Sequence, residues 1–374
     1  MPFILHWGTR KQSPLGLGPF ILMEYIDHTT DLSTALNTPT LGGDDRPILN
    51  PSISIDRLEI FYAQMADILI QLSRLSLPRI GSLAQIDDFT WEANHRPLTI
   101  GMNELVRLGT LPRSGLPTTT YETASAYFNA LAELHLEHLT HQRNDAVDSA
   151  NDCRRKFVAR QLFLKLAREG RLNTSLDDHG PFRIWCDDLR PSNILVNENN
   201  QIVGVIDWEF TYAAPVEYSH APPWLLLLEQ PEYWPDGIEA WEKEFKSRLQ
   251  TFLKVLIERE EAAIQQGRLS QDQRFSGPMR QSWENGDFWI TYAASKNFAF
   301  DSIFWKKLDP LFFGPSTVAE EHRREERIGL LSEEERQCME QVVDRKLEQM
   351  QERALAWEPE EVYTPGLEAC HPPI

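Results

Sequence analysis

The sequence of this 374-residue chain predicts an α+β fold in which helices form most of the body. Three observations lead to this class. Two short β-branched runs separated by a polar turn, near the middle of the chain, predict a β-hairpin. Apolar residues recur at helical spacing before and after that hairpin. A further apolar run at residues 20–26 predicts a buried strand with a polar exit.

The segment around this first strand is short and contains few basic residues. Nineteen residues precede Phe20, and Arg10 and Lys11 are the only basic ones among them. The stretch from Gly16 to Pro19 superficially suggests a glycine-rich nucleotide loop. Because it lacks the flanking strand and helix that such a loop requires, we interpret it as a turn.

Helices and a ribbon are expected between this strand and the hairpin. Residues 37–51, rich in Thr, Pro, Gly and Asp, predict a loop. Ser54 or Asp56 is expected to cap a helix that ends before Pro78. Residues 80–100 predict a surface β-ribbon, and residues 119–139 and 152–169 predict two amphipathic helices.

The hairpin itself comprises residues 194–196 and 202–206, joined by the turn Asn197-Glu198-Asn199-Asn200. Antiparallel pairing of these strands brings their outer ends together. Asn193 and Asp207, which flank the two strands, are therefore expected to lie at the same end of the hairpin.

Helical patterns follow at residues 236–266 and 282–307, and residues 318–353 predict one long solvated helix that packs on its own domain rather than on a partner. Three features of the predicted helical regions have two interpretations each. The aromatic cluster between Trp283 and Trp305 indicates core rather than a substrate cap. Asp301 either recognises an acceptor or is an ordinary exposed acid. His135, His138 and His141 lack a fourth ligand, which favours helix histidines over a metal site.

Composition limits the classes of function. The chain contains 41% hydrophobic and 25% charged residues, as expected of a globular protein, and its formal net charge of −19 argues against a nucleic-acid surface. No run of about 18 apolar residues predicts a membrane helix, and the N-terminus lacks a signal peptide pattern. Cys153, Cys186, Cys338 and Cys370 show no metal spacing, so we expect reduced thiols and a cytoplasmic protein.

The candidate chemistry resides in the segment Cys186-Asp187-Asp188-Leu189-Arg190-Pro191-Ser192-Asn193 and in Asp207, fourteen residues after Asn193. Phosphoryl transfer requires a carboxylate that meets the acceptor hydroxyl. It also requires an amide and a second carboxylate that hold Mg²⁺ against nucleotide phosphates. An Asp, an Asn five positions later and an Asp after the next hairpin match these requirements.

This segment resembles the catalytic and metal-binding loops of the aminoglycoside phosphotransferase (phosphotransferase enzyme) family, relatives of the protein kinases. The continuation through Trp208-Glu209-Phe210 resembles fungal members of that family in particular. The resemblance implies a protein-kinase-like fold, mainly the helical C-lobe with a truncated N-lobe. It also implies ATP and Mg²⁺ as cofactors and a small molecule with a hydroxyl group as acceptor.

The resemblance also implies roles for individual residues. Asp188 matches the catalytic Asp, and Asn193 and Asp207 match the two metal ligands. Glu24 and Ile26 match hinge residues whose main chain binds adenine, and Met23 matches a wall of the adenine pocket.

The segment departs from the family pattern immediately before the catalytic Asp. The family usually has His-Gly there, whereas this chain has Cys186-Asp187, and the adjacent acid makes the base assignment ambiguous. Spacing favours Asp188. Arg190 either contacts phosphate or tethers a neighbouring acid, with the tether favoured, and Glu209 is either a second acid of the site or a strand-end residue.

The resemblance divides the chain into three parts: a remnant N-lobe strand and hinge at residues 1–36, a kinase-like C-lobe at 37–317, and a charged C-terminal helix and tail at 318–374. The family's phosphate-covering loop and phosphate-binding Lys have no counterpart before residue 20. The main alternative is therefore a catalytically impaired, kinase-like binding module, or a fragment of a natural chain that starts upstream. The choice of ATP or GTP, the acceptor and the oligomeric state stay open.

Overall fold

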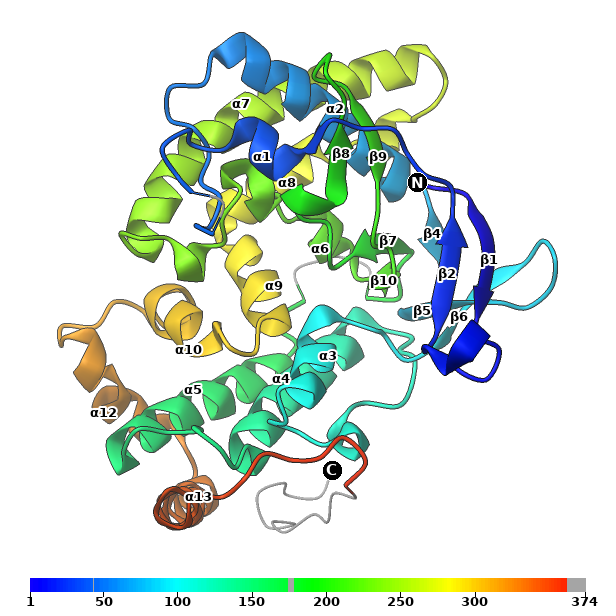
Figure 1. The fold of residues 1–374 in the computed structure, drawn as a ribbon. Coiled ribbons are helices and arrows are strands. Elements are labelled where there is room, and N and C mark those ends of the chain that lie inside the picture. The colour runs from blue at the N-terminus through cyan, green and yellow to red at the C-terminus, as the bar shows by residue number, and fades with distance from the viewer. Residues whose placement is uncertain (43, 174–177, 362–374) are drawn as a thin grey trace. The chain divides into compact units, whose positions relative to one another are not determined.

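The computed structural model describes residues 1–42, 44–173 and 178–361, and the chain forms two compact units (Figure 1). Both units are assembled from separate stretches of the sequence. The first comprises Met1–Arg74, Cys186–Phe210 and Pro223–Ser276, and the second comprises Leu75–Trp185, Thr211–Pro222 and the described residues from Gly277 onward. Together they give the mixed α+β class that the sequence predicts.

The first unit combines two small sheets with two long helices. Its strands are β1 (Ile4–Gly8), β2 (Phe20–Met23), β3 (Thr30–Asp31), β8 (Ile194–Val196) and β9 (Ile202–Val205). Its helices are α1 (Leu32–Leu36), α2 (Ile55–Ser73) and α7 (Ile238–Gln265).

The predicted hairpin is confirmed as the antiparallel pair β8–β9. Its register places Ile194 opposite Val205 and Leu195 opposite Gly204. Strand β3 pairs with the other edge of β8, so the sheet order is β3-β8-β9. All three side chains of the central strand β8 are buried, so both of its faces are covered.

Helices α2 and α7 of this unit pack side by side (Figure 1). Ser54 caps α2 by accepting from the amide of Arg57, as one of the two predicted caps requires. In the core, the ring of Tyr62 meets Phe252 of α7 edge to face, and its hydroxyl donates to the carbonyl oxygen of Leu226 at 2.9 Å. A buried Tyr with a satisfied hydroxyl supplies apolar area without an unpaired polar group.

The second unit contains a five-stranded sheet and most of the remaining helices. Its strands, in the sheet order β4-β7-β10-β5-β6, are β4 (Ser76–Leu77), β7 (Phe182–Cys186), β10 (Thr211–Ala214), β5 (Gly81–Gln85) and β6 (Trp91–His95). Its helices before residue 300 are α3 (Ile100–Arg107), α4 (Ala124–His141), α5 (Ala150–Arg168), α6 (Val216–His220), α8 (Ser276–Asn285) and α9 (Asp287–Ser295). The later ones are α10 (Phe300–Ile303), a π-helical turn (Phe304–Leu308), α11 (Asp309–Phe313), α12 (Arg323–Arg327) and α13 (Glu333–Glu352).

Several predicted elements of this unit are confirmed. The ribbon expected at residues 80–100 is the pair β5–β6, and the two helices expected before the hairpin are α4 and α5, which pack against each other. The helix predicted at residues 282–307 is wrong as a single element. It is interrupted at Gly286, whose φ of 87° is left-handed, and again after Ser295.

The single C-terminal helix predicted for residues 318–353 is also wrong. Helix α13 starts anew at Ser332, because the Ser332 and Glu335 side chains form a reciprocal capping box. Its expected packing on its own unit is confirmed, since α13 lies against α5 and Glu340 forms a bidentate ion pair with Arg154. Residues 362–374 of the predicted tail lie outside the described residues.

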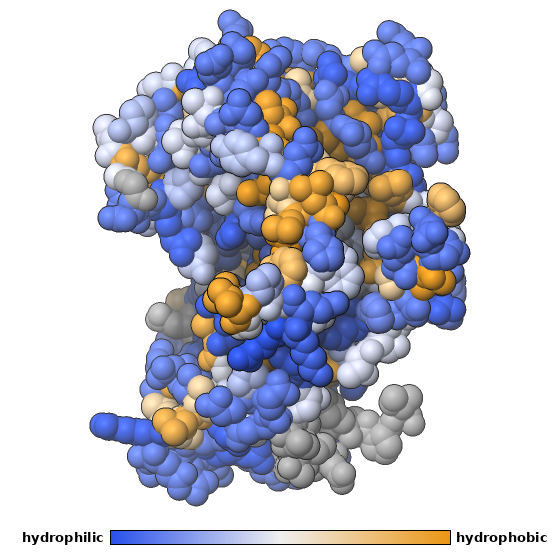
Figure 2. Space-filling model, turned by 45° about the vertical axis from the view of Figure 1, so that its right-hand side comes forward, coloured by the Kyte–Doolittle hydropathy of each residue, from blue (hydrophilic) through white to orange (hydrophobic). Residues whose placement is uncertain are grey.

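The N-terminal strand differs from the expected buried strand in two ways. It pairs with β1, which the sequence pattern did not indicate, and its side chains are exposed, with Ile21 at 57%. The physical reason is that β1 and β2 form a sheet of only two strands. Figure 2 shows a surface on which hydrophobic residues are exposed among hydrophilic ones.

Within the described residues, no helix is both long enough and apolar enough to cross a bilayer. Cys153 and Cys186 are buried thiols, as expected. The expectation of a reduced thiol is wrong for Cys338, which is disulfide-bonded. Cys370 lies outside the described residues.

A buried lysine links α13 to the end of α4 and should make stability depend on pH. Lys346 is 1% exposed, and its ammonium group donates to the carbonyl oxygen of Gln142 and to Oε1 of Gln349. Burial lowers the pKa of Lys346 to about 7. Between that value and about 10.4, the ordinary lysine pKa, the unfolded chain binds a proton that the folded chain does not, so stability rises with pH through this window.

We therefore expect Lys346→Met to flatten the stability profile. Subtracting the free energy of unfolding of the parent from that of the variant gives a difference at each pH. This difference should be roughly 2–4 kcal/mol more favourable to the variant at pH 6 than at pH 10. Urea unfolding across this range measures it, with the exposed Lys243→Met as control. Parallel profiles for Lys346→Met and the parent would contradict the burial of a charge at this position.

Candidate active site

All the residues singled out as a site lie in the first unit, on three segments. Met23, Glu24 and Ile26 are at and after the end of β2. Asp188 and Asn193 are in the loop before β8, and Asp207 directly follows the Ile206 that ends the predicted hairpin. The fold of this one unit therefore brings together segments that are more than 160 residues apart in the sequence.

Asp188 and Asn193 are fixed relative to each other by a closed turn. The Asn193 side-chain amide donates to the carbonyl oxygen of Asp188 at 3.0 Å, and the Arg190 amide donates to the same oxygen at 2.8 Å. Pro191–Asn193 form one 3₁₀ turn, in which the proline fixes its own φ. Both side chains are nearly buried, Asp188 at 6% and Asn193 at 3% exposure.

The carboxyl group of Asp188 experiences opposing influences. Burial raises its pKa, and the negative charges of Glu209 and Asp207 raise it further, while the Arg190 guanidinium and the Asn193 side chain lower it. The net direction is upward because desolvation is the largest effect. These influences mean that Asp188, Asp207, Glu209 and Arg190 are close enough to interact electrostatically.

Asp207 adopts an uncommon backbone conformation at the end of the hairpin. Its φ is 58°, in the left-handed region that non-glycine residues other than Asn and Asp rarely occupy. The preceding residue, Ile206, donates its amide to the carbonyl oxygen of Asn193 at 3.0 Å. Asn193 and Asp207 are therefore at the same end of the hairpin, as its register predicts.

The groups at this end suit a hard cation. Since the Asn193 Nδ2 donates to Asp188, its Oδ1 is the atom left to act as a ligand, and Asp207 supplies carboxylate oxygens. Mg²⁺ prefers oxygen ligands and is often held by one or two carboxylates together with substrate phosphates and water. No group of three or more His, Cys, Asp or Glu among the described residues is arranged to hold a metal, so phosphate ligands would have to complete the coordination.

The segment after β2 has two main-chain groups free for a ligand. The Glu24 amide donates to the carbonyl oxygen of Phe3 at 2.9 Å, and the Ile26 carbonyl oxygen is 2.8 Å from Nδ1 of His28. Across the described contacts, the Glu24 carbonyl oxygen and the Ile26 amide have no hydrogen bond. A carbonyl and an amide two residues apart are an acceptor and a donor of the kind that adenine could pair with.

Two further contacts of these segments were not predicted from the sequence. A Cβ atom at Gly204 of β9 would lie 2.5 Å from Cδ1 of Ile26, so a side chain there would require the end of Ile26 to shift. The Trp208 indole donates to the carbonyl oxygen of Val205 at 2.7 Å, which folds the chain back after Asp207. The contact between Gly204 and Ile26 had one signal in the sequence, which is a glycine inside a β-branched strand.

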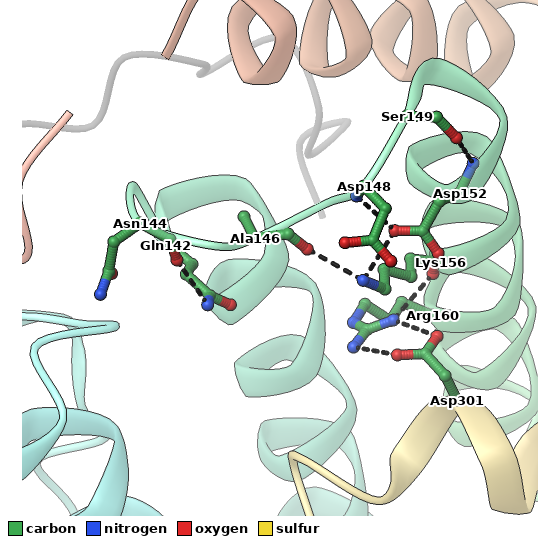
Figure 3. Close-up of polar contacts among 9 residues, drawn as sticks. All are labelled: Gln142, Asn144, Ala146, Asp148, Ser149, Asp152, Lys156, Arg160 and Asp301. Carbon is green, nitrogen blue, oxygen red and sulfur yellow. Dashed lines mark hydrogen bonds and ion pairs between the residues drawn. The ribbon is translucent and has the colours of Figure 1, made fainter. Parts of the chain in front are cut away.

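The remaining candidates lie in the second unit and have structural partners. Figure 3 shows Asp301 facing Arg160, and the two guanidinium nitrogens donate to its two oxygens at 2.7 and 2.9 Å. Asp301 is thus paired rather than an ordinary exposed acid. Most of the aromatic cluster is buried, as a core interpretation requires, although Phe298 is 46% exposed.

The three histidines of α4 are more buried than expected of residues on a helix surface. His135 is fully buried, and its Nε2 lies 3.0 Å from the carbonyl oxygen of Ala293. Burial lowers the pKa of His135 to about 3, with the positive charge of Arg160 adding to the effect. This histidine is therefore neutral and serves as a buried link between α4 and α9.

The comparison with known protein families agrees with this geometry. The sequence model described as the phosphotransferase enzyme family matches residues 5–219, which is more than half of the chain and includes Met23, Glu24, Ile26, Asp188, Asn193 and Asp207. This chain belongs to that family. No curated protein and no solved structure shows a significant match to it.

The conformation of Asp207 leads to a test of the backbone alone. Asp207→Asn should keep the free energy of unfolding close to that of the parent, because Asn tolerates a positive φ. Asp207→Val should cost roughly 1–3 kcal/mol more, because a β-branched side chain is strained there. Asn200, in the hairpin turn, has the same φ of 58°. Asn200→Val is therefore the matched control, because it places a β-branched residue at this φ outside the proposed site. Equal stability of the two Asp207 variants in chemical unfolding would show that the loop relaxes without cost.

Proposed function

We propose that this protein is an ATP- and Mg²⁺-dependent phosphotransferase that acts on a hydroxyl group of a small molecule. One observation supports this proposal above all: a single closed turn holds the buried Asp188 next to Asn193, and the hairpin places Asp207 at the same end. Membership of the phosphotransferase enzyme family supports the reaction class. The continuation through Trp208 to Phe210 favours a place among its fungal members.

In this proposal Asp188 is the group that meets the acceptor. Its carboxylate orients the hydroxyl and takes its proton while the new oxygen–phosphorus bond forms and the bond to the leaving ADP oxygen breaks. The upward shift of its pKa by burial makes it a better proton acceptor than an exposed Asp. The spacing argument favoured Asp188 over Asp187, and burial of Asp188 beside Asn193 supports the same choice.

The other residues of the site would bind and orient the nucleotide. Asn193 and Asp207 would hold Mg²⁺, which neutralises charge on the phosphates when it is bound. The Glu24 carbonyl oxygen and the Ile26 amide would pair with adenine, and Met23 would line the base pocket. The carbonyl of Ile26 and the amide of Glu24 would not take part, since each already has a partner.

A binding module without turnover is the second candidate function, and one observation favours it. Before β2 the only basic side chains are Arg10 and Lys11, both exposed in the turn after β1. Farther along, Gly16 and Gly18 have open space around them, with nothing within 4 Å of a Cβ built at either position. Loss of the contacts that a phosphate-covering loop and Lys make would cost on the order of 10²–10³ in rate.

Nucleotide binding should be visible as stabilisation. At about 100 times its dissociation constant, Mg-ATP should raise the free energy of unfolding by roughly 2.7 kcal/mol, which is a few degrees in thermal unfolding for a chain of this size. The shift should require Mg²⁺ and should disappear in Asp207→Asn. A shift that is independent of both Mg²⁺ and Asp207 would refute the proposed metal site.

Catalysis is tested separately at Asp188. Asp188→Asn should keep the Mg-ATP shift but reduce phosphoryl transfer to a panel of small hydroxyl compounds, or to water, by roughly 10²–10⁴-fold. Asp187→Asn is the matched control and should reduce it much less. Binding of Mg-ATP by the parent with no turnover above that of Asp188→Asn would support the binding module instead.

A further inference from the structure

We propose that Arg183, Trp185 and His220 form a binding site for an oxyanion, the carboxylate or phosphate group of a small molecule. All three residues belong to the second unit, and the site requires neither the nucleotide nor the metal of the proposed function. It assigns a negatively charged ligand to residues that the proposed reaction does not use. Three features support it: a shared strand face, an arginine without a counter-ion, and donors without acceptors.

The first feature is the face of β7 that lies against α6. Arg183 and Trp185 are on the same face of this strand, because side chains two residues apart point to the same side. Both are partly exposed, whereas the three residues of β7 that alternate with them are buried. The ring of Trp185 meets that of Tyr218 in α6 edge to face, with centroids 5.7 Å apart. His220 lies two residues farther along the same helix, which brings it to this face as well.

The second feature is the guanidinium group of Arg183. It makes no hydrogen bond or ion pair with any residue that the structure describes. Burial lowers the pKa of Arg183, and no described carboxylate offsets this effect. The charge of Glu217, the acid of α6, is not among those that shift the pKa of Arg183 or His220. A charge taken partly out of water is costly unless a counter-charge or hydrogen bonds replace the water, and a bound oxyanion supplies both.

Other arginines of the second unit show what a structural role looks like. Arg160 donates to both oxygens of Asp301 at 2.7 and 2.9 Å. Arg154 likewise donates to both oxygens of Glu340 at 2.8 and 2.6 Å. Each pair uses the planar fork of the guanidinium, which matches two oxygens of a carboxylate or phosphate. The fork of Arg183 has no such acceptor within the described part of the chain, so it is available to a ligand.

The third feature is a pair of neutral groups next to Arg183. The Nε1 of Trp185 is buried and has no hydrogen-bond partner, although buried polar groups are nearly always paired. The His220 ring makes no hydrogen bond with a described residue. Burial and the positive charge of Arg183 lower the pKa of His220 to about 4, so near pH 7 this ring is neutral and carries one N–H donor. Arg183 therefore supplies the charge, and the two rings supply further donors.

Small oxyanions test this site directly. Inorganic phosphate and acetate are titrated separately into the whole chain at constant ionic strength, without nucleotide or Mg²⁺, and thermal unfolding reports binding. At least one of them should stabilise the parent. Arg183→Gln should weaken that anion's apparent affinity by roughly tenfold or more, the effect of losing hydrogen bonds to a charged group. Arg183→Lys should retain part of the affinity, because it keeps the charge but not the fork.

The two anions distinguish the possible ligands, and a second arginine provides the control. Stabilisation by phosphate alone indicates a phosphate-bearing ligand, and stabilisation by acetate alone indicates a carboxylate. Arg96 is also partly buried in the second unit, and burial lowers its pKa, but its guanidinium donates to the carbonyl oxygen of Pro97. Arg96→Gln should therefore leave the affinity for the anion unchanged.

The pKa of His220 gives a second readout, which a general effect of salt would not move. An anion bound next to Arg183 offsets the positive charge that lowers this pKa, so binding should raise it from about 4. NMR spectra of the imidazole protons, assigned with His220→Gln, follow the titration. The same pKa with and without saturating anion would contradict the placement of the ligand.

An unoccupied structural arginine predicts a different pattern. Equal stabilisation of the parent and Arg183→Gln would be a general ion effect and would overturn the inference, as would the absence of stabilisation by either anion. If Arg183→Gln does not fold, Trp185→Phe replaces it, since this variant keeps an aromatic ring against Tyr218 but removes the Nε1 donor. It should also weaken anion binding. None of these outcomes bears on the proposed function, which is tested with Mg-ATP.

Discussion

The hydrogen bond from the Asn193 side chain to the carbonyl oxygen of Asp188 is the contact on which the whole site depends. It closes a turn of six residues and thereby sets the distance between a carboxylate and an amide oxygen. The same turn leads straight into β8, whose pairing with β9 returns the chain to Asp207. A site built in this way is preorganised, since few torsions remain to be fixed when a ligand binds.

The arrangement also reconciles two demands on Asp188. A carboxylate that is to accept a proton benefits from burial, whereas a buried charge without partners is costly. Asp188 meets both demands because its main chain anchors the loop while its side chain faces Arg190. Burial raises the pKa of Asp188 and the Arg190 guanidinium lowers it, so the two features act in opposite directions, with burial the larger.

The hairpin and the long helices were predictable from the sequence because local signals and tertiary packing agree there. The turn at Asn197–Asn200, the β-branched runs beside it and the Ser54 cap each indicate the element that forms. The exposure of β2 and its pairing with β1 were not predictable, since an apolar run says nothing about how many strands will cover it. The break before α13 was missed because the charge pattern continues through it, although the Ser332 and Glu335 capping pair was present in the sequence.

Within the site, the residue types and spacings indicated Asp188, Asn193 and Asp207, but they could not show how the groups are held. The pairing of the Glu24 amide with the carbonyl oxygen of Phe3 joins two separate segments, which no local pattern encodes. The interpretation of Asp301 failed for a similar reason. Its partner, Arg160, is 141 residues away in the sequence and comes from a different helix.

The close approach of Ile26 to Gly204 has a consequence for how the sequence of this protein can vary. The two positions compete for the same space, because the end of Ile26 occupies the volume that a side chain at 204 would need. A larger residue at position 204 therefore requires either a shift of the Ile26 side chain or a smaller residue at position 26, and we expect the two positions to change together in related chains. Since Gly204 is three residues before Asp207, the size of the residue at position 26, in the segment proposed to face adenine, bears on the end of the hairpin that carries the proposed metal ligands. A change of bulk at position 26 is therefore expected to be accompanied by a change on β9.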